Sequence, residues 1–132
     1  MKLITRDTDY ALRSLCFIAK SKENIVTVTE LTGKLRVPYP FLRKILQVLN
    51  RKGVLRSVKG QGGGFMLAKD PALIFLTDIM QIFQGELKLN ECSLKKLICP
   101  ERKTCPLRKK ISGIERYVLG ELNSISIASL IK

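Results

Sequence analysis

The fold is decided by the stretch Leu55-Arg-Ser-Val-Lys-Gly-Gln-Gly-Gly-Gly-Phe-Met-Leu67. Residues 54–58 and 65–67 have the composition of short strands, and the glycine-rich stretch between them predicts a turn. We therefore expect a two-stranded hairpin. Gly53, directly before the hairpin, is suited to end a preceding helix.

Three helices are expected upstream of the hairpin. Residues 8–20 place apolar side chains on one face at helical spacing. A second helix follows Thr27, which can cap it, with Glu30 completing a capping box and Val26 and Leu31 placed as a hydrophobic staple, and it ends near residues 33–34. A third helix spans residues 38–52, after a turn at 36–38. Helix, short helix, turn, helix and two-stranded wing is the order of a winged helix–turn–helix module.

Two further helices are expected after the wing. One runs from about residue 76 to Gly85, and a long one begins at Pro106 and ends near residue 123. A cysteine-bearing loop, 86–104, lies between them, and the apolar tail 124–131 is expected to pack back. The fold class is mainly α with a small β-hairpin. We expect one domain with three parts: the winged module at 1–70, the linker helix and cysteine loop at 71–104, and a dimerisation helix with a tail at 105–132.

The charge is strongly positive and unevenly distributed. The chain has 132 residues and a net charge of +13, and residues 31–69 carry nine basic residues without one acid. A run of one sign suggests a polyanion partner, although a merely soluble basic face is the alternative. The pattern does not favour a membrane surface, and no apolar run approaches the ~20 residues that cross a bilayer. Without a secretory signal, the expected location is the cytoplasm.

The third helix is the candidate recognition helix, since the major groove of DNA admits one α-helix. Arg43 is the best candidate for reading a base, and Lys44 is as well suited to phosphate. The wing is the second candidate contact, although its glycines could serve only a tight hairpin. The complete candidate set for DNA is Thr29, Tyr39, Phe41, Arg43, Lys44, Arg51, Arg56, Ser57, Lys59, Gly60, Gln61 and Gly62.

The long C-terminal helix carries one apolar stripe. Its members follow at steps of four, three, four and four residues: Leu107, Ile111, Ile114, Val118 and Leu122. Such a stripe on a helix outside the compact module predicts a homodimer interface. Packing against its own domain is the competing interpretation.

Three of the four cysteines cluster as Cys92, Cys99 and Cys105, and two of them precede a proline. In a reducing compartment this spacing indicates metal ligands or redox groups before disulfides. Cys105 is expected at the N-cap of the last helix, where the helix dipole favours a thiolate. Cys16 is expected to be a small buried hydrophobe. The absence of histidine removes His-based catalysis and His ligation, and no catalytic site is expected.

Several motifs resemble the Rrf2 family of bacterial winged-helix transcription regulators. They are Met1-Lys-Leu, Tyr10-Ala-Leu-Arg13, Val37-Pro38, Phe41-Leu42, the wing segment 55–67, the three-cysteine loop and Ser126-Ile-Ala-Ser-Leu130. The resemblance covers nearly the whole chain. It implies a homodimeric regulator, in the first place a repressor, that binds a palindromic operator and carries one iron–sulfur cluster per subunit, [4Fe-4S] rather than [2Fe-2S].

By the same resemblance, Cys92, Cys99 and Cys105 fall on the cluster cysteines, although the first gap is one residue longer than usual. IscR-like members add a histidine, which this chain lacks. NsrR-like nitric-oxide sensors add an aspartate from the partner's first helix, which puts Asp9 on the ligand position, with Asp7 as the second choice. The chain therefore resembles the NsrR-like sensors most, and nitric oxide or an oxidant is the implied signal.

Other interpretations stay open from the residues. Asp9 could simply favour a helix N-terminus. The cysteines could hold a structural zinc, or act as a cluster-free thiol-redox switch. A small iron–sulfur electron-transfer protein is the alternative from a different class, and the acid-free basic run argues against it.

Overall fold

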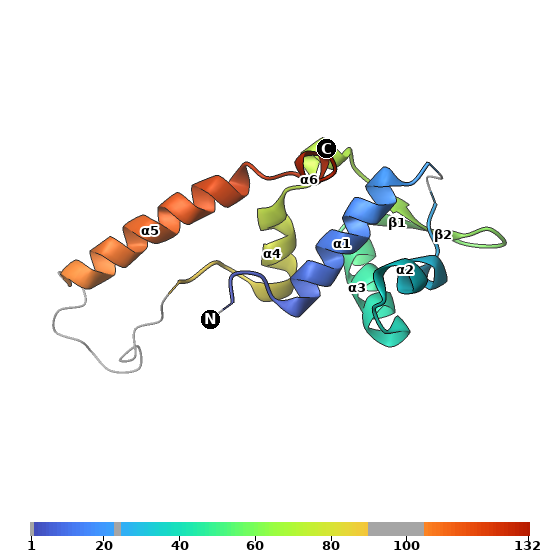
Figure 1. The fold of residues 1–132 in the computed structure, drawn as a ribbon, viewed down its shortest axis with the longest axis horizontal. Coiled ribbons are helices and arrows are strands. Elements are labelled where there is room, and N and C mark those ends of the chain that lie inside the picture. Colours follow the sequence, from blue (N-terminus) through green and yellow to red (C-terminus); the bar gives the residue numbers. More distant parts are fainter. Residues whose placement is uncertain (1, 23–24, 90–104) are drawn as a thin grey trace.

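The computed structural model describes residues 2–22, 25–89 and 105–132. The helices outnumber the strands, which form one two-stranded antiparallel sheet (Figure 1). In chain order the elements are α1 (Arg6–Lys20), α2 (Val28–Leu35), α3 (Tyr39–Arg51), β1 (Leu55–Val58), β2 (Gly64–Leu67), the 3-10 helix η1 (Pro71–Leu73), α4 (Leu76–Gln84), α5 (Pro106–Asn123) and α6 (Ile127–Leu130). The expected fold class is confirmed.

Local capping explains where the first helices begin. Thr5 caps α1, so this helix starts two residues earlier than its apolar face suggests. Thr27 caps α2, and its Oγ1 accepts a hydrogen bond from the Glu30 backbone N–H at 3.1 Å, which is one of the two bonds of the expected capping box. The second helix extends to Leu35, and Arg36 closes it in the left-handed conformation (φ 56°).

The wing is a regular hairpin that is tied to the rest of the module. Leu55 pairs with Leu67 and Val58 pairs with Gly64 in the antiparallel register. The backbone of Val26 adds a short bridge to β2, since its N–H and C=O bond Phe65 at 2.9 and 2.8 Å. Strand β2 is therefore anchored on the segment that leads into α2, while the turn of the hairpin projects from the molecule (Figure 1).

The main core gathers side chains from both ends of the chain. Leu15 of α1, Leu46 of α3 and Leu55 of β1 lie in it, together with Ile79 of α4 and Ile127 of α6. The C-terminal tail returns through a backbone bridge between Phe75 and Ser126. The tail expected to pack back does so as a short helix, and the core of the winged module continues beyond residue 70.

Helix α5 has a different relation to the rest of the chain. It runs away from the module, on the side opposite the wing (Figure 1). Its bounds match the expected helix, with Cys105 as N-cap and Pro106 in the first turn. Within this fully described helix, Leu122 is the one buried residue. Leu122 joins a second small cluster with Leu76 and Met80.

Candidate nucleic-acid interface and cysteine site

Helix α3 divides its residues between a buried and an exposed face. Leu42, Ile45, Leu46 and Leu49 are buried in the main core. The side chains left outside are the candidates on this helix: Tyr39, Phe41, Arg43, Lys44 and Arg51 are all exposed. Because the apolar face fixes the rotation of the helix, the cationic side chains can only face solvent. This is the geometry that an element entering a DNA groove requires.

The wing candidates are exposed in the same way. Thr29 on α2 and the six wing residues from Arg56 to Gly62 in the candidate set all lie at the surface. A side chain that the sequence reasoning missed links the wing to α3: Asn50 Oδ1 accepts a hydrogen bond from the Ser57 backbone N–H at 3.1 Å. Asn50 therefore ties the C-terminal end of α3 to the first strand of the wing. No sequence signal distinguishes it from any polar residue near a helix end.

The wing glycines have a structural reason to be glycine. Gly60 and Gly62 have φ values of 97° and 77°, which other residues rarely adopt. A Cβ on Gly64 would lie 2.5 Å from the Val26 carbonyl oxygen, because the two segments pair there. The glycine run therefore follows from the hairpin, so the basic neighbours Arg56 and Lys59 carry the argument for DNA.

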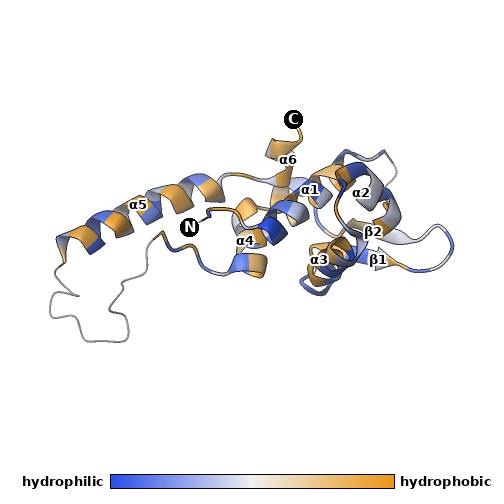
Figure 2. Cartoon of the chain, turned by 60° about the horizontal axis from the view of Figure 1, so that its bottom comes forward, coloured by the Kyte–Doolittle hydropathy of each residue, from blue (hydrophilic) through white to orange (hydrophobic). Residues whose placement is uncertain are grey.

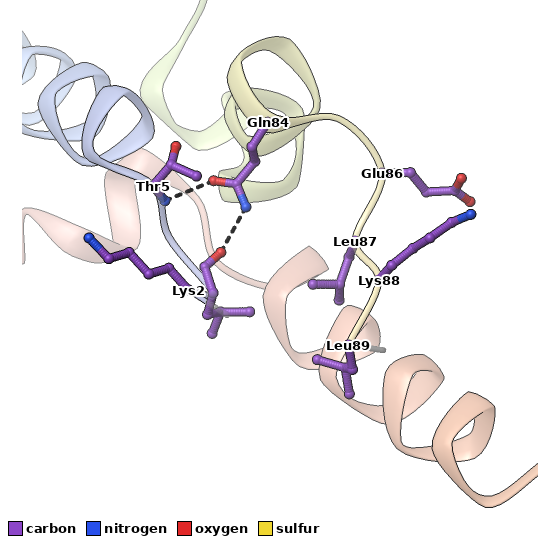
Figure 3. A pocket seen from close by; sticks show the side chains of 8 residues that line it. Lys2, Thr5, Gln84, Glu86, Leu87, Lys88 and Leu89 are labelled. Atoms are coloured by element: carbon purple, nitrogen blue, oxygen red, sulfur yellow. Dashed lines mark hydrogen bonds between the residues drawn. The ribbon is translucent and has the colours of Figure 1, made fainter. Parts of the chain in front are cut away.

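The first turn of α1 is fastened to the end of α4 by one side chain (Figure 3). Gln84 Oε1 accepts hydrogen bonds from the Thr8 hydroxyl at 2.7 Å and the Thr5 N–H at 3.1 Å. Its Nε2 donates to the Leu3 carbonyl at 2.8 Å. Thr8 is fully buried. This contact, which we call the Gln84 latch, joins segments about 80 residues apart and has no signal in the sequence.

A shallow hollow of about 260 Å³ lies beside the latch, between the N-terminal segment and the stretch after α4. Figure 3 shows Lys2 and Lys88 at its margins. Leu89, at the end of this stretch, donates its N–H to Glu115 Oε1 of α5 at 2.7 Å. The chain that leads toward Cys92 is therefore fixed both to α1 and to α5.

Two of the four expected cluster ligands lie within the described residues. Asp9 sits on α1 with its side chain partly exposed and pairs with Arg13, where Oδ2 and Nε are 3.0 Å apart. Cys105 is the partly buried N-cap of α5, and its side chain makes no capping hydrogen bond. Cys92 and Cys99 fall outside the described residues. Across residues 2–22, 25–89 and 105–132, no three His, Cys, Asp or Glu side chains gather as a metal site.

Cys16 differs from the clustered cysteines. It packs against the main core at partial burial, as expected of a small hydrophobe. Burial raises the pKa of the Cys16 thiol, and the nearby Lys20 ammonium offsets part of that rise. The thiol form is therefore favoured at neutral pH, which makes Cys16 a poor nucleophile and a poor ligand.

The apolar stripe of α5 is divided along its length. Leu122 is buried and Val118 packs beside it against the second cluster, so this end follows the competing interpretation of packing on its own domain. Leu107 and Ile114 are 64% and 51% exposed, and Ile111 is half-buried. Figure 2 shows hydrophobic segments alternating with hydrophilic ones along α5. Tyr117, which lies about one helical turn after Ile114 on α5, is 71% exposed.

Known proteins share sequence and fold with this chain. A predicted HTH-type transcriptional regulator of Aquifex aeolicus (strain VF5) is 39% identical over 92 residues, which cover 70% of this chain and 64% of that protein. The chain thus spans less than two thirds of this relative. In the region described by the structure, no helix is long and apolar enough to cross a membrane.

Two solved structures share the fold at low identity. CymR, the global cysteine regulator of B. subtilis, is 20% identical with a TM-score of 0.83, and the match covers 99% of this chain and 97% of CymR. IscR of T. potens is 22% identical with a TM-score of 0.75, covering 99% and 86% of the two chains. The family described as Rrf2, iron-dependent transcriptional regulator, matches residues 4–132. The chain belongs to the Rrf2 family and is a DNA-binding transcription regulator, not an enzyme.

Proposed function

We propose that this protein is a homodimeric repressor that binds a palindromic operator through α3 and the wing. One observation carries the proposal: every candidate side chain of α3 and the wing is exposed, while the opposite face of α3 is buried in the core. Within residues 31–69 this surface contains no acid. A DNA duplex attracts such a surface through its phosphates.

The roles within this surface follow from side-chain chemistry. The Arg43 guanidinium can bond guanine with two parallel hydrogen bonds, so it is proposed to read a base in the major groove. Lys44 and Arg51 are point contacts for phosphate. Arg56, Lys59 and Gln61 lie in or beside the wing and are proposed to meet the sugar–phosphate backbone or the minor groove. Phosphate contacts set the register, and the base contact sets the sequence.

The dimer is proposed to form along the projecting part of α5. Leu107 and Ile114 are exposed and Ile111 is half-buried, so together they present an apolar surface along this part of α5. A helix with one apolar stripe gains by burying it against a second helix, at roughly 25 cal/mol per Å² of apolar surface. Two copies joined in this way carry two recognition helices, which a palindromic operator matches.

The signal is proposed to act through an iron–sulfur cluster of the NsrR-like kind, with nitric oxide or an oxidant as the stimulus. Cys92, Cys99 and Cys105 would hold the cluster, with Asp9 of the partner subunit as the fourth ligand; [4Fe-4S] is favoured over [2Fe-2S]. The donor chemistry fits where the structure describes it, since Cys105 and Asp9 are both partly exposed, although the Asp9 carboxylate would have to leave its ion pair with Arg13. Cysteine thiolates are the usual ligands of such clusters.

A thiol switch without a cluster is the second candidate. It is supported by the similarity to CymR, which is described as a global cysteine regulator. In that case Cys92, Cys99 and Cys105 would be oxidised reversibly. A structural zinc is the third possibility, although three cysteines with one aspartate is an unusual set for zinc.

The sensing proposal is tested by purifying the protein without oxygen and measuring iron, sulfide and zinc per chain. The expected result is that the wild type contains iron and sulfide. Cys99→Ser and Asp9→Ala should lower the amount of both per chain, and Cys16→Ser should leave it unchanged. Zinc alone, or no metal, would reject the cluster. Cys16→Ser is the matched control because its thiol lies against the core.

The DNA surface is tested separately, with duplexes selected from a random pool by the wild-type protein. Arg43→Ala is expected to relax the base preference at one position of each half-site, with a loss of about tenfold or more. Lys44→Ala should weaken all sequences alike and lower the salt dependence of log affinity by about 0.9. Lys132→Ala, at the C-terminus, should change neither. Equal effects of all three variants would reject the assignment.

A further inference from the structure

Arg6 of α1 lies beside the N-terminal end of the candidate recognition helix α3. The Arg6 guanidinium sits over the Phe41 ring, with its central carbon 5.0 Å from the ring centroid. Arg6 is the first residue of α1, and Phe41 lies in the first turn of α3. The Arg6 side chain is 61% exposed and Phe41 is 47% exposed. The pair therefore brings a fixed positive charge, from a different helix, to the start of the candidate recognition helix.

A contribution to the stability of α1 does not explain why an arginine stands at position 6. A cation at a helix N-terminus faces the positive end of the helix dipole, which favours anions. Asp7 and Asp9 already supply negative charge there. Arg6 does approach Asp7, with Nε and Oδ1 3.6 Å apart, but both side chains are more than half exposed. Exposed pairs of this kind contribute little to stability.

The stack with Phe41 has a clearer consequence for recognition. A guanidinium over an aromatic ring gains about 0.5–1 kcal/mol at an exposed site, and its edge keeps its N–H donors available. An arginine held in this way loses less conformational entropy when it binds a phosphate. The ring, in turn, is covered on one face and cannot act as a freely rotating apolar contact.

We propose that Arg6 is a DNA-contact residue that binds a backbone phosphate beside the groove entered by α3, and that Phe41 positions it. The proposal rests on the assignment of α3 as recognition helix and extends the DNA surface outside residues 31–69, to the opposite end of the module's sequence. A phosphate is the expected partner because Arg6 lies on α1, next to the recognition helix and not on it. In helix–turn–helix proteins and homeodomains, elements beside the recognition helix contact the DNA backbone.

The test compares Arg6→Ala, Arg6→Lys and Phe41→Leu on the duplex selected by the wild-type protein. Arg6→Ala is expected to weaken binding about tenfold and to lower the salt dependence of log affinity by about 0.9, as for the loss of one phosphate contact. Arg6→Lys should keep the salt dependence but lose several-fold in affinity, because an ammonium lacks the planar stack. In a Phe41→Leu background, Arg6→Ala should have a smaller effect than in the wild type.

Lys20→Ala is the matched control. Lys20 is an exposed cation at the other end of the same helix, about 21 Å from Arg6 at 1.5 Å per residue. It should change neither affinity nor salt dependence. If Arg6→Ala behaves like Lys20→Ala while Arg43→Ala and Lys44→Ala still weaken binding, the Arg6 proposal is wrong and the α3 surface stands.

If Arg43→Ala and Lys44→Ala are also without effect, the proposed function fails instead. A changed base preference in a selection repeated with Arg6→Ala would overturn the phosphate assignment. Thermal unfolding of each variant shows whether a loss of binding comes from a loss of folding, and a midpoint near the wild-type value is expected for Arg6→Ala.

Discussion

The winged module and helix α5 use apolar residues in opposite ways. In the module, every core side chain from Leu15 to Leu55 finds partners within its own chain. In α5, which projects from the module (Figures 1 and 2), Leu107 and Ile114 of the apolar stripe are exposed and Leu122 alone is buried. The core of the module is therefore complete in one chain, whereas the proposed dimer surface on α5 would need a second chain. The winged module would thus bind DNA, and α5 would set the spacing between the two modules of a dimer.

The largest expected effect comes from making the same substitution in both regions. Ile45→Ala removes a buried side chain of α3, and a cavity of this kind lowers the free energy of unfolding by about 2–5 kcal/mol. Ile114→Ala removes an exposed one and should change the intrinsic stability of a single chain by less than about 0.5 kcal/mol. Urea unfolding followed by circular dichroism measures both.

Protein concentration makes this comparison sharper. If α5 forms the dimer, Ile114→Ala should raise the dimer dissociation constant in sedimentation equilibrium and weaken the concentration dependence of unfolding. Ile45→Ala should lower the unfolding free energy at every concentration. A loss of 2 kcal/mol or more in monomeric Ile114→Ala would show that the two regions are not as different as their burial indicates.

The next effect concerns the Gln84 latch, which joins the start of α1 to the end of α4. Gln84→Ala leaves the buried Thr8 hydroxyl and the Thr5 N–H without the acceptor that they share. Loss of such a partner lowers the free energy of unfolding by about 1–3 kcal/mol. Gln81→Ala, on an exposed position of the same helix, is the control and should have little effect. Equal stability of the two variants in thermal unfolding would mean that the latch does not hold α1.

The sequence predicted the elements better than it predicted the contacts between them. Periodicity and capping residues located the first three helices, the wing and the full length of α5, because those signals are local. The latch between Gln84 and Thr8 and the link between Asn50 and Ser57 depend on side chains that fold together from distant or unmarked positions. No regular spacing in the sequence indicates either contact.

The candidate site shows the same limit. Exposure of the cations on α3 followed from the apolar face of the helix, which the sequence displays. Whether the stripe of α5 faced its own domain or solvent could not be read from its spacing, since both arrangements use the same period. The structure divides the stripe, with Leu122 inward and Ile114 outward. The left-handed conformation of Arg36 could not be predicted from the sequence either, because glycine is the residue that usually indicates this conformation at a helix end.

The smallest expected effect tests whether the module is optimised throughout. Arg36 holds a φ of 56° at the end of α2, which disfavours residues with a Cβ. Arg36→Gly should therefore raise the free energy of unfolding, by at most about 1 kcal/mol, whereas Lys34→Gly in the last turn of the same helix should lower it by about the same amount. Opposite shifts of the thermal midpoint are the expected result. Arg36 also belongs to the basic run before α3, so a simultaneous loss of DNA affinity in Arg36→Gly would show that its side chain contributes to binding. Shifts of the same sign would contradict the strain itself.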